Sequence, residues 1–91
     1  MPFPTFRKAR ADTFAARMQR ARNEGYERGA NEAELFKRSV GKSVFERQQA
    51  IDWLNRAIEN GRVELESQHA WEREIEAWDM SCRIAFLVAT V

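Results

Sequence analysis

The sequence predicts an all-α protein: a small bundle of three to four helices folded as a single domain over residues 1–91. Three observations support this fold class. The chain has 91 residues, which is enough for one domain only. Its two prolines both lie within the first four residues, so the rest of the chain lacks the strongest helix breaker. Apolar side chains recur every three or four residues along several segments, as they do on the buried face of a helix.

The first predicted helix covers about residues 5–23. Thr5 has the hydroxyl of a helix N-cap, and Gly25 stands where a C-terminal cap belongs. We therefore expect a loop over residues 25–31. Five apolar residues share an arc of about 120° and should face the core: Ala11, Phe14, Ala15, Met18 and Ala21. An adjoining face of the same helix carries a basic ridge, which consists of Arg10, Arg17 and Arg20.

Two further helices are predicted over about residues 32–39 and 44–60. The second of these has a capping box, in which Ser43 and Glu46 each satisfy a backbone donor of the first turn. Its apolar face is continuous and is expected to end at Gly61; the face consists of Ala50, Ile51, Trp53, Leu54, Ala57 and Ile58. Phe45 projects from the polar side of this helix, which makes it a candidate contact residue.

The last predicted helix covers about residues 68–89, with Ser67 as its expected N-cap and residues 62–66 as a connector. Its apolar residues follow one another at spacings of 4, 3, 4, 3 and 4: Trp71, Ile75, Trp78, Cys82, Ala85 and Ala89. These spacings are typical of the seam of a left-handed helix pair. We therefore expect this face to pack against another helix.

The C-terminal tail after Arg83 is apolar on every side. Such a segment must be buried all round as a helix, or on both faces as a strand, and the sequence leaves both forms open. Four apolar residues opposite the seam need cover of their own: Met80, Ile84, Leu87 and Val88. We expect them to lie in a subunit contact, most simply a symmetric homodimer. The alternative is that the tail forms the centre of a monomeric core.

Residues suited to catalysis or metal binding are few. Cys82 is the only cysteine and lies on the apolar seam, so its thiol is expected to act as a small hydrophobe. Glu66 and His69 have the spacing of half a di-iron motif, but the chain has only one histidine. We therefore expect no enzyme, no metal and no cofactor. No apolar run approaches the ~20 residues that span a bilayer, and we expect a cytoplasmic protein without membrane contacts.

The formal net charge of +1 conceals an uneven distribution of charge along the chain. Residues 1–47 contain eleven Lys or Arg and six Asp or Glu, whereas residues 48–91 contain four and eight. The acidic side chains of the last helix include a ridge of Glu72, Glu76 and Asp79. We expect this ridge to pair with the basic ridge of the first helix, and the pairing to select orientation more than it stabilises.

These features predict a small non-catalytic helical protein that acts by protein–protein contact. The expected role is a regulator or inhibitor of a larger complex, or an accessory subunit, in a size class common among viral and mobile-element products. The expected interface residues are Arg10, Arg17, Arg20, Phe45, Ile84, Leu87 and Val88. The alternative is a small DNA- or RNA-binding regulator that uses Arg10, Arg17, Arg20 and Arg47. Dedicated nucleic-acid binders usually have a more basic domain than this one.

Overall fold

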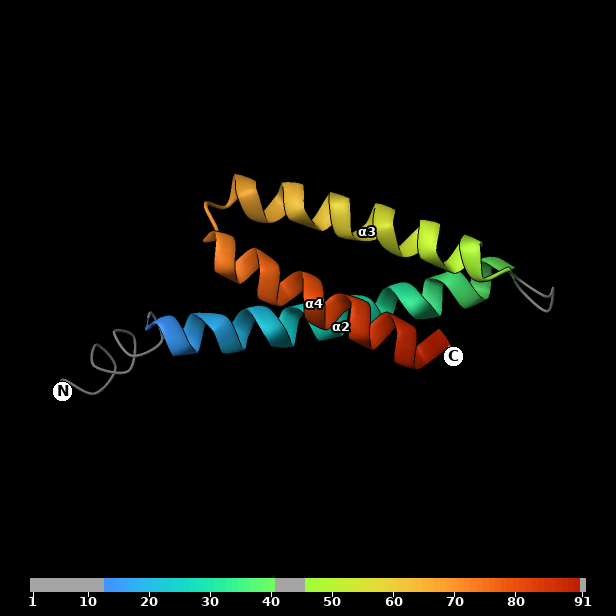
Figure 1. The fold of residues 1–91 in the computed structure, drawn as a ribbon, viewed down its shortest axis with the longest axis horizontal. Coiled ribbons are helices and arrows are strands. Elements are labelled where there is room, and N and C mark those ends of the chain that lie inside the picture. Colours follow the sequence, from blue (N-terminus) through green and yellow to red (C-terminus); the bar gives the residue numbers. More distant parts are fainter. Residues whose placement is uncertain (1–12, 41–45, 91) are drawn as a thin grey trace.

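The computed structural model describes residues 13–40 and 46–90, and these residues form three helices and no strand. The helices are α2 (Phe14–Val40), α3 (Arg47–Ser67) and α4 (Glu72–Thr90) (Figure 1). The prediction of a small all-α bundle is therefore confirmed. The C-terminal tail, for which the sequence allowed a helix or a strand, is helical up to Thr90.

The helix α2 corrects the prediction of two short helices separated by a loop. It is continuous from Phe14 to Val40, so the expected loop over residues 25–31 is helical. Small residues four positions apart form one buried face of α2: Ala21, Gly25, Gly29 and Ala33. A Cβ atom at Gly25 would overlap the backbone oxygen of Trp78, and one at Gly29 would overlap that of Cys82. These glycines are required by the close approach of α4, and packing outweighs their low helix propensity.

The helix α3 begins and ends later than the sequence suggested. Glu46 is its N-cap, and the Glu46 backbone N–H donates to Oε1 of Gln49 at 3.1 Å. The predicted capping box had Ser43 as the N-cap and Glu46 as the third helical residue. Because Glu46 is itself the N-cap, that prediction is wrong for Glu46, and Ser43 lies outside the described residues. Gly61 does not end α3, because it is buried and a Cβ there would overlap the indole ring of Trp78. The expected connector at residues 62–66 is part of α3.

A Schellman motif ends α3. The backbone N–H of Ala70 donates to the carbonyl of Leu65, and that of His69 donates to the carbonyl of Glu66, both at 3.0 Å. His69 has a φ of 60°, in the left-handed region that glycine usually occupies at this position. Because α3 extends to Ser67, the prediction that Ser67 caps the last helix is wrong.

The helix α4 starts at Glu72, and its first turn is closed without a Ser, Thr, Asp or Asn cap. The backbone N–H of Trp71 donates to Oε1 of Glu74 at 2.8 Å, which is the half of a capping box contributed by the third helical residue. The expected seam of α4 is buried at Ile75, Trp78, Cys82 and Ala85 and partly buried at Ala89, while Trp71 is 43% exposed. We call these five buried and partly buried residues the inner seam: Ile75, Trp78, Cys82, Ala85 and Ala89.

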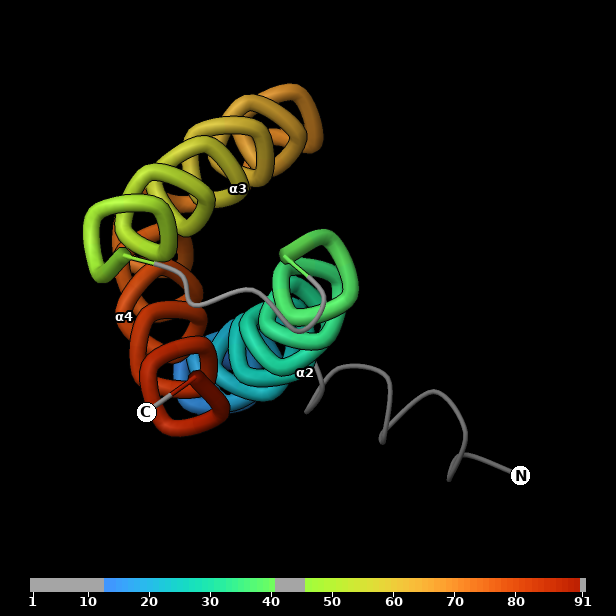
Figure 2. Tube along the Cα trace, turned by 90° about the vertical axis from the view of Figure 1, so that its right-hand side faces the viewer, coloured from blue at the N-terminus to red at the C-terminus, as the bar shows by residue number. Residues whose placement is uncertain are grey.

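The three helices run up, down and up, so that α2 and α4 run in the same direction and cross each other (Figure 1). Viewed end-on, α4 lies beside both of the other helices, and α3 and α2 diverge from it (Figure 2). The inner seam packs on α2, and the core is completed by Phe36 and Phe86, whose ring centroids are 5.9 Å apart. The largest fully buried side chains are Phe36, Phe86, Ile75 and Cys82.

Candidate protein-binding surface

A stripe of exposed apolar side chains runs along α4 on the side away from the inner seam. Its members are Met80, Ile84, Leu87 and Val88, which are 66%, 51%, 46% and 67% exposed. At 100° per residue these four positions share an arc of about 100°, roughly opposite the inner seam. We call them the outer stripe. The helix α4 therefore has two apolar faces, of which its own chain covers one.

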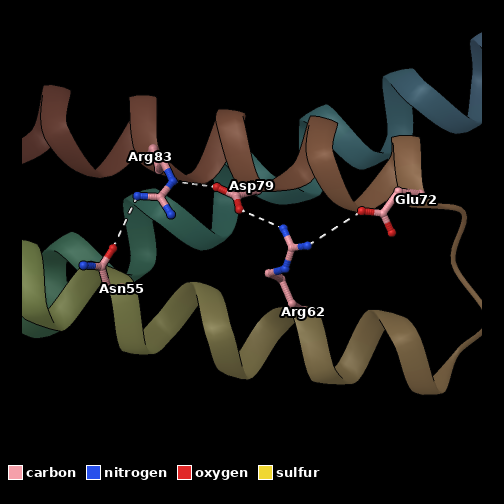
Figure 3. Close-up of polar contacts among 5 residues, drawn as sticks. All are labelled: Asn55, Arg62, Glu72, Asp79 and Arg83. Atoms are coloured by element: carbon pink, nitrogen blue, oxygen red, sulfur yellow. Dashed lines mark hydrogen bonds and ion pairs between the residues drawn. The ribbon is translucent and has the colours of Figure 1, made fainter.

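The arrangement of the helices explains why the outer stripe stays uncovered. The inner seam faces α2, with Gly25 and Gly29 against the backbone of Trp78 and Cys82. The helix α3 contacts α4 on a third side, which carries Asp79 and Arg83 in the polar contacts of Figure 3. The described chain has no fourth helix to place over the remaining side of α4.

An apolar groove between α3 and α4 adjoins the outer stripe at Leu87. The groove has a volume of about 700 Å³, and its apolar lining comes from Ala50, Ile51 and Leu54 of α3 together with Leu87. Polar side chains complete its lining: Arg47, Asn55, Arg83 and Thr90. The apolar surface of the C-terminal half of α4 thus continues onto α3.

A polar network holds α3 against α4 and accounts for much of the local charge (Figure 3). Asp79 is its centre: Oδ2 contacts Nη1 of Arg62 at 3.1 Å, and Oδ1 accepts from Nε of Arg83 at 2.6 Å. Arg62 also lies 3.9 Å from Glu72, and Arg83 donates to Asn55 at 3.3 Å. Glu72 and Asp79 therefore pair with Arg62 of α3, and not with the basic ridge of the first helix as expected.

The basic ridge contacts α4 through a different carboxylate. Nη2 of Arg17 lies 2.5 Å from Oε1 of Glu74, and its guanidinium lies 3.6 Å from the centre of the Trp71 ring. The hydrogen bond from Arg17 lowers the pKa of Glu74, and the charge of Arg20 acts in the same direction. Phe14, which was expected in the core, is 50% exposed and stacks on Trp71 with ring centroids 6.3 Å apart. Arg17 therefore contacts Glu74 and Trp71 of its own chain.

The remaining predicted site residues that the structure describes lie at two ends of the molecule. Arg10 and Phe45 lie outside the described residues. Arg47 is the first residue of α3, at the end of the molecule opposite to the start of α2, where Arg17 and Arg20 lie (Figure 1). Arg47 therefore lies far from Arg17 and Arg20. The residues that the structure does bring together are those of the outer stripe.

Catalytic and metal-binding groups are scarce in the described part of the chain. No three His, Cys, Asp or Glu side chains there are arranged to hold a metal ion. Burial raises the pKa of the Cys82 thiol to about 11, so the nucleophilic thiolate is disfavoured at neutral pH. The backbone of Glu66 and His69 closes the Schellman motif.

Comparison of the chain with models of known protein families, with curated proteins and with solved structures finds no match. No helix within residues 13–40 or 46–90 has the length and apolar character needed to cross a membrane.

Proposed function

We propose that this chain is a non-catalytic helical protein that acts by binding another protein chain through the outer stripe of α4. One observation supports this proposal above the others: four large apolar side chains lie side by side on a helix, each about half exposed or more. The exposed parts of these side chains together form a contiguous apolar patch of roughly 400 Å², within the ~300–600 Å² of the largest patch on a typical monomer. Patches of this size are often functional.

The outer stripe is not required by the fold. Single exposed apolar residues are common on soluble proteins and need no explanation, but a contiguous row on one helix face does. The inner seam already supplies the apolar face through which α4 packs on α2. Polar residues on the outer face would leave that packing in place, so the apolar residues there are best explained by a partner. A regulator, an inhibitor or an accessory subunit of a larger complex would need only such a surface.

The proposal is tested by affinity purification of the tagged protein from its native source, with nuclease treatment of the lysate. Two variants are compared with the wild type: Ile84→Asp in the outer stripe, and Val63→Asp as a control on α3, where Val63 is 61% exposed. We expect a protein partner that survives nuclease and the Val63→Asp change but is lost with Ile84→Asp. A partner that Ile84→Asp retains, or one released by nuclease, would contradict the proposal; release by nuclease would favour nucleic-acid binding.

A further inference from the structure

We propose that the occupant of the outer stripe is a second copy of this chain, with the two α4 helices antiparallel and the two-fold axis next to Ile84. This inference rests on the proposed function, because it names the partner of the same surface. In this arrangement Ile84 faces itself across the axis, and Met80 faces Val88 of the partner subunit. The pairing buries the outer stripes of both copies together.

The spacing of the outer stripe is that of a helix pair. Met80, Ile84 and Leu87 follow one another at intervals of 4 and 3 residues, which keeps a seam facing a partner helix of the same kind. Val88 extends this seam by one side chain next to Leu87. Met80 and Val88 lie four residues on either side of Ile84, so an antiparallel pair centred on Ile84 places apolar side chains against each other at the middle and at both ends of the contact, while Leu87 lies opposite the small Ser81. A two-fold contact needs a surface that is complementary to itself, and this match of large and small side chains meets the requirement.

The charges of α4 select the antiparallel orientation. Residues 77–90 contain one acid and one base, Asp79 and Arg83, which already contact each other at 2.6 Å. An antiparallel pair centred on Ile84 overlaps only this neutral part of the two helices. A parallel pair would extend the contact along the same face into the start of α4, where Arg73 and Glu76 are exposed, and would place each of them beside the same residue of the second copy. Like charges at a contact disfavour that arrangement.

The area of the outer stripe agrees with a dimer of moderate affinity. Roughly 400 Å² of apolar surface per copy gives about 800 Å² for the pair, and apolar atoms make up about 60% of typical interfaces. The total buried area would then be about 1,300 Å², near the lower end of the range for specific interfaces. We therefore expect a dissociation constant in the micromolar range.

The first measurement is sedimentation equilibrium of the purified full chain over concentrations from about 1 μM to about 1 mM. The wild type and the control Val63→Asp should both dimerise. Ile84→Asp should raise the dissociation constant at least about 100-fold, because it places two carboxylates against each other at the axis. Its helical content should be unchanged, since Ile84 is 51% exposed in the single chain. A wild type that remains monomeric throughout this range would overturn the proposal.

Single cysteine variants test the orientation. The native Cys82 is fully buried and should not react, whereas the thiol of Ile84→Cys lies at the axis and should form a disulfide between copies in a glutathione buffer. Met80→Cys alone should not cross-link, because its two copies would be about 12 Å apart along the helices. A mixture of Met80→Cys with Val88→Cys should cross-link. Efficient cross-linking of Met80→Cys without Val88→Cys would refute the antiparallel pair, because only a parallel pair places residue 80 against its own copy.

The two proposals fail in different ways. A monomeric wild type whose outer stripe still captures a nuclease-resistant partner would reject the homodimer and leave the protein-binding role intact. A dimer that depends on Ile84, in a protein that captures no other chain, would support self-association and reject the role in a larger complex.

Discussion

The crossing of α2 and α4 gives the sharpest test of the fold, because a single methyl group should disturb it. Gly29 lies in the middle of α2, and a Cβ atom there would overlap the backbone oxygen of Cys82 and come within 2.9 Å of the Cβ of Ala85. A backbone oxygen cannot rotate away as the end of a flexible side chain can. In Gly29→Ala the two helices must therefore move apart.

The expected effect is the difference between two terms of opposite sign. Replacing glycine by alanine in an open helix stabilises it by up to about 1 kcal/mol, because alanine loses less backbone entropy. Forcing an extra carbon into a packed contact costs about 1–3 kcal/mol, and the rigid partner places this site at the upper end. We expect a net loss of about 2 kcal/mol. For a chain of this size that loss corresponds to a fall in Tm of roughly 8–16 °C.

Thermal and urea unfolding, followed by circular dichroism, measure this loss. The control is Ser39→Ala, at an exposed position on the same helix, which should change the free energy of unfolding by less than about 0.5 kcal/mol. A Gly29→Ala variant that is more stable than the wild type would show that α2 is open at this point. The reasoning about the crossing would then be wrong.

Three other predictions follow from single contacts. Trp53 is only partly buried, and its ring meets that of Phe36 edge-on with centroids 5.6 Å apart. Trp53→Ala should therefore lower the free energy of unfolding in urea by about 2–3 kcal/mol, less than the 3–5 kcal/mol typical of a fully buried Trp. A change below about 1 kcal/mol would contradict this packing. His69→Gly should stabilise the chain by about 0.5–1 kcal/mol, because glycine adopts the φ of 60° without strain; a loss would contradict this account of the turn. Because Arg17 lowers the pKa of Glu74 in the fold, Glu74 stabilises the protein above its ordinary pKa of 4.5, and this contribution is lost as the pH falls through the lower value. Glu74→Gln should therefore weaken the loss of stability in acid, and an unchanged difference between neutral and acid pH would refute the contribution.

The sequence was sufficient for the fold class and for the buried faces of α3 and α4, because both depend on local periodicity, whereas only Met18 and Ala21 of the face predicted for the first helix are buried. The inner seam of α4 was predicted from its spacing, and the buried residues of α3 include Leu54 and Ile58 from its predicted apolar face. Phe86, which is fully buried, was missed because it lies next to the seam and outside its strict spacing. The tail is apolar on every side, so its sequence pattern does not distinguish the residues that are buried from those that are exposed.

The glycines show why element boundaries could not be predicted in the same way. A glycine in a helical pattern indicates either a stop or a close approach, and the choice depends on a segment far away in the chain. Gly25 and Gly29 face the backbone of Trp78 and Cys82, more than 50 positions later, and Gly61 lies under the ring of Trp78. The expected loop and the expected end of α3 both failed for this reason.

The partners of the charged residues also depended on how segments far apart in the chain pack together. The expected pairing of the basic ridge with Glu72 and Asp79 requires a particular rotation of α4 relative to α2. The glycine contacts set that rotation, which turns Glu74 toward Arg17 and leaves Glu72 and Asp79 facing Arg62 of α3. Opposite net charges on two helices indicated that they would meet, but not through which side chains.

The two apolar faces of α4 have different physical roles: the inner seam stabilises the fold of the single chain, and the outer stripe is proposed to bind a second chain. The inner seam packs against glycine and alanine at the crossing, so α2 and α4 bring their backbones close through small residues. The outer stripe has the large side chains Met80, Ile84 and Leu87, which contribute little to a single chain because about half or more of each stays in water. A polar change in the outer stripe should therefore leave the free energy of unfolding of a monomeric sample within about 0.5 kcal/mol of the wild type. The same substitution on the inner seam, such as Cys82→Asp, should prevent folding, because it buries an unpaired charge at a fully covered site. A variant such as Ile84→Asp that unfolded the dilute protein would show that the outer stripe belongs to the core, and both proposals for that surface would fail.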